Sequence, residues 1–144
     1  MVKLFISLFL FSSLLLFSAE SLAQASNDSH VVHVQTWKLK MLPTDDDADA
    51  FAEVLKRQSD VINSDSRVIS SYVLRHFWGA DSRDLVMVAE FKSSEDLFAF
   101  YEELGPMMEK AFSKEELDKD NALFDKYVGE HSDEIYRVVD GTSK

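Results

Sequence analysis

The sequence predicts an α+β domain, a four-stranded antiparallel sheet with helices on one face. Four segments rich in β-branched and aromatic residues alternate with helical segments in the order β-α-β-β-α-β. The second helical segment is long and broken. At 144 residues, the chain is long enough to form one domain with its own hydrophobic core.

The first strand and the first helix follow each other closely. Residues 31–40 alternate in polarity and are rich in valine, so they form a strand, which Pro43 ends. Thr44 can cap the following helix, and the aspartates at 45–47 suit the positive end of its dipole. Apolar residues at helical spacing continue this helix to about residue 63.

The second and third strands form a hairpin. Residues 67–78 and residues 83–92 have strand composition, and residues 79–82 between them, Gly-Ala-Asp-Ser, have the composition of a turn. We therefore expect two antiparallel neighbours joined by a four-residue loop.

The remaining segments complete the βαββαβ order. Residues 93–96 cap a second helix, which Gly105-Pro106 interrupts. A capping box at residues 113–116 restarts it, so residues 105–129 form an interrupted extension. Residues 134–139 supply the fourth strand. This order is that of the ferredoxin-like fold.

The N-terminus has the features of a secretory signal peptide. Lys3 precedes an apolar run at residues 4–17, and small residues follow. Cleavage after Ala25 leaves residues 26–144, and cleavage after Ala23 is the alternative. We expect export to the periplasm or the medium and no stable membrane association after cleavage. An uncleaved N-terminal anchor is the other interpretation.

Composition excludes several classes of function. The chain contains no cysteine, so disulfides and cysteine-ligated metals are impossible. Its net charge of −11 gives no electrostatic basis for binding nucleic acid or an anionic membrane surface. An acidic surface also favours solubility.

The alternation of the strands predicts which side chains face the helices. With a four-residue loop, Trp78 lies opposite Arg83 and His76 opposite Leu85. A one-residue error in this loop would mix the two faces. The predicted helix-facing set of the three strands is Tyr72, Leu74, His76, Trp78, Leu85, Met87, Ala89, Phe91, His33, Gln35, Trp37 and Leu39.

The opposite face has an apolar centre that one layer of helices cannot cover. Its valines are Val32, Val34, Val73, Val86 and Val88. A second copy packed sheet against sheet would cover them, so we expect a homodimer, with Arg75 and Glu90 pairing across it. The alternative is a monomer in which this face of the sheet is partly exposed to solvent.

The opening VVHVQTWKLK and the run LVMVAEFKSSEDLFAFY resemble the dimeric α+β barrel superfamily. The resemblance is strongest to its stress-responsive barrel-domain and antibiotic-biosynthesis-monooxygenase-like groups. It implies a barrel formed across a dimer, with a ligand pocket between each sheet and its helices. Members include cofactor-free oxygenases, cyclases, lactone isomerases and haem-handling enzymes. His33 stands where the stress-responsive group often carries histidine, whereas residues 105–129 depart from the compact family pattern.

Three side chains are candidates for chemistry in this pocket. His33 or His76 could act as a general base, and Tyr72 could donate to a developing oxyanion. The alternative is that these residues are core or strand-end groups. His131, in a predicted loop, could close over the pocket. The predicted pocket lining is Trp37, Trp78, Gln35, Leu74 and Met87.

No cofactor or metal is expected. Either His33 or His76 could ligate a haem iron, but no sequence feature requires it. The Asp45-x-Asp47-x-Asp49 pattern starts like a calcium loop but lacks its later glycine and glutamate, so we interpret it as a helix N-terminus. Phosphate-loop and zinc-protease motifs are absent from the sequence.

Three hypotheses for function follow. The leading one is binding of a small apolar or aromatic molecule between sheet and helices. The second is a cofactor-independent oxygenase, isomerase or cyclase that uses His76 or His33 as base. The third is a structural or interaction protein whose aromatic residues are all core. Fold alone cannot choose among them.

Overall fold

The computed structural model describes residues 30–142, so the expected signal peptide at residues 1–25 lies outside the described residues. No helix within the described range is both long and apolar enough to cross a membrane. The helices and strands, in chain order, are β1 (Val31–Leu39), α1 (Asp45–Asn63), β2 (Val68–Arg75), β3 (Asp84–Phe91), α2 (Ser94–Ala111), α3 (Lys114–Tyr127) and β4 (Val128–Arg137).

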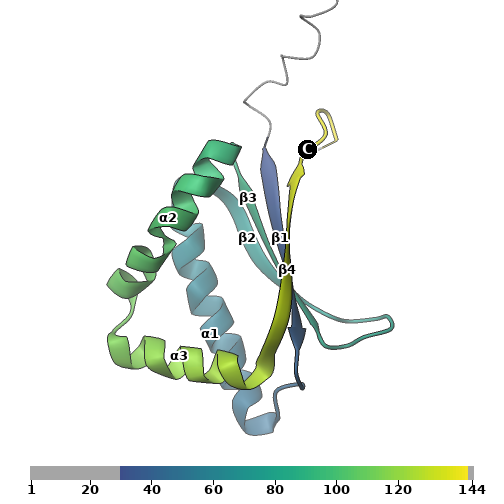
Figure 1. The fold of residues 1–144 in the computed structure, drawn as a ribbon, viewed down its shortest axis with the longest axis vertical. Coiled ribbons are helices and arrows are strands. Elements are labelled where there is room, and N and C mark those ends of the chain that lie inside the picture. The colour runs from purple at the N-terminus through teal and green to yellow at the C-terminus, as the bar shows by residue number, and fades with distance from the viewer. Residues whose placement is uncertain (1–29, 143–144) are drawn as a thin grey trace, which may run out of the picture.

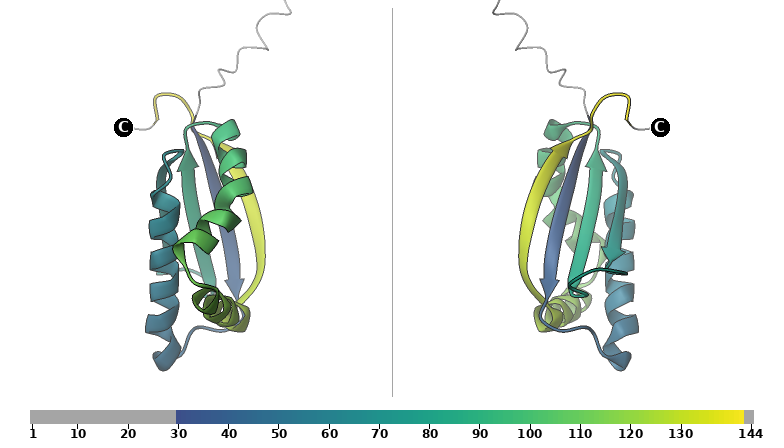
Figure 2. Two further views of the ribbon diagram at one scale, coloured as in Figure 1. Left: turned by 90° about the vertical axis from the view of Figure 1, so that its left-hand side faces the viewer. Right: turned by 90° about the vertical axis from the view of Figure 1, so that its right-hand side faces the viewer.

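The four strands form one sheet in the order β2-β3-β1-β4, with every neighbouring pair antiparallel. All three helices lie on one side of this sheet (Figure 1). The other side, which we call the open face, carries no helix, as the right-hand view of Figure 2 shows. This arrangement confirms the predicted ferredoxin-like α+β fold.

The core lies between the sheet and the helices in two clusters. One cluster packs Phe91 of β3 against Phe100 of α2, with ring centroids 5.2 Å apart. The other surrounds Tyr127, at the end of α3, whose ring meets Phe51 of α1 at 5.9 Å. Burial of aromatic and aliphatic groups of this size stabilises the fold by roughly 1.5–3 kcal/mol for each side chain.

Two of the predicted helix caps are confirmed. The Ser93 side chain accepts a hydrogen bond from the Asp96 backbone amide at the start of α2. Ser113 and Glu116 form the capping box that begins α3. Thr44 precedes α1 as expected, but its side chain accepts no hydrogen bond from the helix.

Two predicted boundaries are wrong. Gly105-Pro106 does not interrupt α2, which runs through Pro106 to Ala111. Proline removes only one backbone donor, and the turns on either side retain theirs. β4 begins at Val128 rather than residue 134, because α3 passes directly into the strand. His131 is therefore a strand residue and not a loop residue.

The predicted register of the β2–β3 hairpin is wrong by one residue. The structure pairs Arg75, not His76, with Leu85, and it pairs Tyr72 with Val88. Side chains alternate between the faces of a sheet, so this shift places Tyr72 and Leu74 on the open face. It also places Arg75, expected at the sheet–sheet interface, on the helix side.

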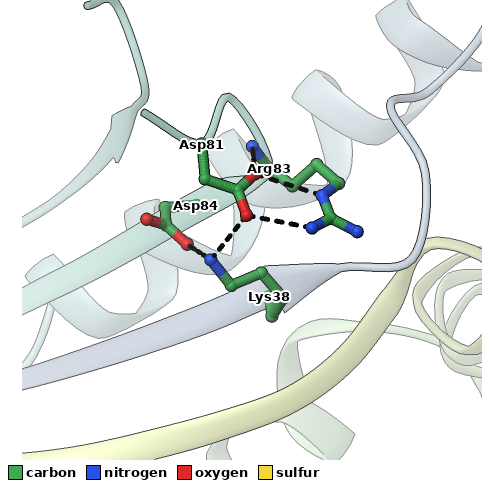
Figure 3. Close-up of polar contacts among 4 residues, drawn as sticks. All are labelled: Lys38, Asp81, Arg83 and Asp84. Carbon is green, nitrogen blue, oxygen red and sulfur yellow. Dashed lines mark hydrogen bonds and ion pairs between the residues drawn. The ribbon is translucent and has the colours of Figure 1, made fainter. Parts of the chain in front are cut away.

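The reason for the shift is a charged turn that the loop prediction did not include (Figure 3). The Asp81 carboxylate accepts the Arg83 backbone amide at 3.0 Å, the Arg83 guanidinium at 2.9 and 3.1 Å, and the Lys38 ammonium at 3.2 Å. Lys38 also pairs with Asp84. Hydrogen bonds from Arg83, and then from Lys38, lower the pKa of Asp81. Residues 76–83 consequently leave the strand ladder.

The junction between α3 and β4 requires glycine. A Cβ on Gly129 would lie 2.8 Å from the Lys38 carbonyl oxygen, a backbone atom that cannot turn away. We expect Gly129→Ala to lower the free energy of unfolding by about 1–3 kcal/mol in urea titrations. The matched control is Gly105→Ala in α2, where nothing lies within 4 Å. That change should raise stability by about 0.5–1 kcal/mol. Equal effects of the two changes would contradict the steric account.

Candidate functional site

A cavity of about 380 Å³ lies between α1 and the sheet. This volume lies within the range of roughly 300–1,000 Å³ that small-molecule sites occupy. The charged residues that line it are Lys56, Arg75 and Asp84. The larger apolar side chains along it are Leu39, Leu42, Phe51, Leu55, Val73 and Leu85.

A second cavity, of about 40 Å³, adjoins the first, because Ser59 of α1 and Val73 of β2 line both. It has room for a group of about the size of a water molecule. The polar side chains along it, apart from the two serines, are His33, Gln35, Gln58 and Tyr101. The two cavities thus form one mostly apolar chamber, with His33 and Tyr101 at its smaller end.

His33 at this smaller end is engaged on both sides of its ring. Its Nδ1 lies 2.6 Å from the Tyr101 hydroxyl of α2, and its Nε2 lies 3.1 Å from the Asp133 carboxylate of β4. The rings of His33 and Tyr101 meet edge to face, with centroids 5.1 Å apart. Only 7% of His33 is exposed. The three residues form one hydrogen-bonded chain.

The positions of the protons in this chain follow from the chemistry of the Asp133 carboxylate and the Tyr101 hydroxyl at its two ends. An ionised carboxylate can only accept hydrogen bonds, so the His33 Nε2–H donates to Asp133. In the neutral imidazole the Nδ1 atom is then an acceptor, and the Tyr101 O–H donates to it. The Tyr101 oxygen keeps its lone pairs for another donor.

Asp133 is the centre of the polar cluster. Its Oδ1 also accepts the Gln35 amide at 2.7 Å, and its Oδ2 lies 3.1 Å from His131 Nε2. The hydrogen bond from Gln35, followed by the nearby His131, lowers the pKa of Asp133. His131 in turn stacks on Trp37 with ring centroids 4.2 Å apart. Asp133 therefore stays ionised at neutral pH.

Tyr101 has the opposite character. Burial, followed by the negative charge of Asp133, raises its pKa to about 12. At neutral pH its hydroxyl keeps its proton and serves as a hydrogen-bonding group.

The structure brings three of the predicted site residues together. His33, Gln35 and Met87 all line the smaller cavity. Trp37 lies on the helix side as expected, beside His131, but lines neither cavity. Its buried Nε1 has no hydrogen-bond partner among the described residues.

The other predicted site residues lie elsewhere, because β2 is shifted by one residue. Tyr72 is among the residues that line the larger cavity, although its side chain alternates to the open face and is 48% exposed. Leu74 also lies on that face. Beyond the end of β2, the His76 ring packs close to Gly79, and Trp78 is 91% exposed. The structure does not bring His76 and His33 into one cluster.

Sequence reasoning missed Tyr101 and Asp133. Tyr101 lies within the second predicted helical segment, where no pattern marks it as a partner of His33. Asp133 fell in a segment read as loop. The available signal was the period-two spacing of His131, Asp133 and Ile135, which pair with Trp37, Gln35 and His33 of β1.

No group of three or more side chains able to hold a metal ion occurs among residues 30–142. The Asp45-x-Asp47-x-Asp49 segment is the first turn of α1, as expected. There the Asp47 carboxylate accepts hydrogen bonds from Lys126 at 2.6 Å and from the Tyr127 hydroxyl at 2.5 Å.

Comparison with solved structures places the fold, and no protein-family model or curated protein matches the chain. A dimeric ferredoxin-like protein from an uncultured marine organism is similar, with 14% identity over 82% of this chain and 95% of the other (TM-score 0.53). A candidate antibiotic biosynthesis monooxygenase from Nitrosomonas europaea has 15% identity, 81% and 96% coverage and a TM-score of 0.52. SnoaB from Streptomyces nogalater, a cofactor-independent oxygenase, has 9% identity, 81% and 99% coverage and a TM-score of 0.50. The predicted resemblance is confirmed for the fold.

The raised pKa of Tyr101 has a consequence at high pH. A group whose pKa is higher in the folded than in the unfolded protein loses its contribution to stability as pH rises through the folded value. From about pH 10, the usual tyrosine value, to about 12, Tyr101 therefore destabilises the wild type progressively. We expect Tyr101→Phe to flatten this part of the stability curve in urea titrations relative to the wild type. An unaltered slope in Tyr101→Phe would contradict the assignment.

Proposed function

We propose that the protein is an exported homodimer that binds a small, largely apolar molecule between its sheet and α1. The observation that carries this proposal is the mostly apolar cavity of about 380 Å³, which adjoins a smaller one lined by His33 and Tyr101. Sites for small molecules have this form, in which apolar walls supply affinity and a few polar groups fix orientation. The N-terminal sequence, with its apolar run at residues 4–17, supports export.

A cavity-filling variant tests the binding proposal. Ala48 of α1 lines the larger cavity, whereas Ala50 of the same helix is exposed and does not line it. With N-phenyl-1-naphthylamine as an apolar fluorescent probe, Ala48→Phe should raise Kd about tenfold or more, which corresponds to about 1.4 kcal/mol. Ala50→Phe should leave Kd unchanged. Absence of probe binding to the wild type, or equal loss in both variants, would contradict the proposal.

The open face supports the homodimer. Tyr72, Leu74 and Tyr136 are 48%, 49% and 54% exposed on it, and Val34 and Val86 lie between them in the register. An apolar surface of this kind is typical of an interface, and similar solved structures are described as dimeric. The β2–β3 loop, with Phe77 and Trp78 almost fully exposed, projects from the same side of the sheet (Figure 1). A second copy packed sheet against sheet would cover all of these groups.

A charge on the open face should break the dimer. We expect Leu74→Asp to give a monomer in sedimentation equilibrium, because an unpaired carboxylate in an apolar interface is strongly unfavourable. Phe98→Asp is the matched control, since Phe98 is equally apolar and 59% exposed but lies on α2. A monomeric wild type, or an unaffected Leu74→Asp, would contradict the sheet-to-sheet dimer.

An enzyme is the second candidate function, and a specific observation favours it. Tyr101, His33 and Asp133 form a hydrogen-bonded chain at the end of the apolar cavity, an arrangement suited to proton transfer. It supports a cofactor-independent oxygenase, isomerase or cyclase, and SnoaB has a similar fold. If the third hypothesis held, that of a purely structural or interaction protein, the wild type would not bind the apolar probe.

A further inference from the structure

We propose that Tyr101 is the group that takes a proton from the bound molecule, and that this molecule carries an acidic hydroxyl, such as a phenol or an enol. His33 then acts through Tyr101 and not directly on the ligand. The inference rests on the proposed binding function and adds the chemical class of the ligand.

The geometry excludes His33 as the direct base in this arrangement. Both of its ring nitrogens are occupied, by Tyr101 at 2.6 Å and Asp133 at 3.1 Å, so no free lone pair of the imidazole faces the cavity. Tyr101, in contrast, lines the smaller cavity, and its hydroxyl oxygen keeps lone pairs while its proton goes to His33. Since the proton of the Tyr101 hydroxyl points to His33, a ligand group that contacts the Tyr101 oxygen must donate a hydrogen bond to it.

The two cavities suit a ligand with one hydroxyl on an apolar body. The smaller cavity of about 40 Å³ admits a hydroxyl, and the larger one of about 380 Å³ admits a ring system. Ser59 and Val73 mark where they adjoin. A ligand lying along α1 would place its hydroxyl at Tyr101.

The proton transfer balances within the chain of three residues. The ligand O–H bond breaks as its proton bonds to the Tyr101 oxygen. The original Tyr101 proton moves to His33 Nδ1. The products are a ligand anion, a neutral Tyr101 that now donates a hydrogen bond to that anion, and an imidazolium that donates to Asp133. The Asp133 carboxylate offsets the new positive charge, as in triads that use serine.

The neighbouring titratable groups allow this step. Besides the three residues of the chain, β4 contributes His131, which lies against the far oxygen of Asp133. The residues of α1, β2 and β3 that line the smaller cavity are all uncharged. His33 is therefore the acceptor adjacent to Tyr101.

The test uses 4-nitrophenol, whose phenolate absorbs visible light, so that its ionisation is read while it is bound. In the wild type the bound probe should ionise at least about one pH unit below the free probe. Tyr101→Phe should bind it with Kd within about threefold but without that shift. Asp133→Asn should reduce the shift, because an amide cannot offset the imidazolium. Tyr136→Phe, on the open face, should retain it.

A second measurement does not depend on any ligand. Nitrogen NMR of the imidazoles should show His33 at neutral pH as the tautomer protonated on Nε2, in the wild type and in a Tyr72→Phe control. A proton on Nδ1 would overturn the inference. Three other results would also overturn it: a bound probe that stays neutral, a shift that survives Tyr101→Phe, and failure of 4-nitrophenol to bind to a protein that binds N-phenyl-1-naphthylamine. Each of these three leaves the binding proposal standing. Failure of both probes to bind overturns both.

Discussion

The alternation of side chains across a sheet covered on one side determines which residues of the strands can reach the polar cluster and which lie on the open face. A strand residue faces either the helices or the open face, and its neighbour faces the other. β1 is central because it pairs with both β3 and β4. Its odd-numbered residues, His33 and Gln35 among them, meet α2 and the Asp133 side of β4. Its even-numbered residues belong to the open face. The polar cluster and the apolar open face therefore both draw on the same nine-residue strand.

The helix side of the sheet combines an apolar cavity with a hydrogen-bonded polar cluster. Phe51, Leu55 and Leu85 give the larger cavity its apolar walls. His33, Tyr101 and Asp133 satisfy one another at its end, so a buried histidine carries no unmet hydrogen bond there. Breaking one hydrogen bond of this chain would leave a buried polar group without a partner, which is unfavourable. The positions of the protons in the chain can change without moving the heavy atoms, and this suits the chain to proton transfer.

The sequence predicted the element order, the sheet and the helix-facing residues of β1 and β3, because valine-rich alternation is a direct consequence of burial. The prediction of the faces failed for β2. The loop after this strand was predicted to have four residues, whereas the hydrogen bonds of Asp81 stabilise a longer loop. This register error of one residue placed Tyr72 and Leu74 on the wrong face of the sheet. Tyr101 and Asp133 could not be found as partners of His33, because they lie 68 and 100 residues away in sequence and pattern reasoning reports only local spacing.

The most direct test is native mass spectrometry of the protein purified gently from its own host. We predict a processed chain that begins near residue 26, a dimer, and a discrete additional mass of a small molecule that is lost on denaturation. A monomer without added mass, which also fails to retain N-phenyl-1-naphthylamine, would contradict this prediction.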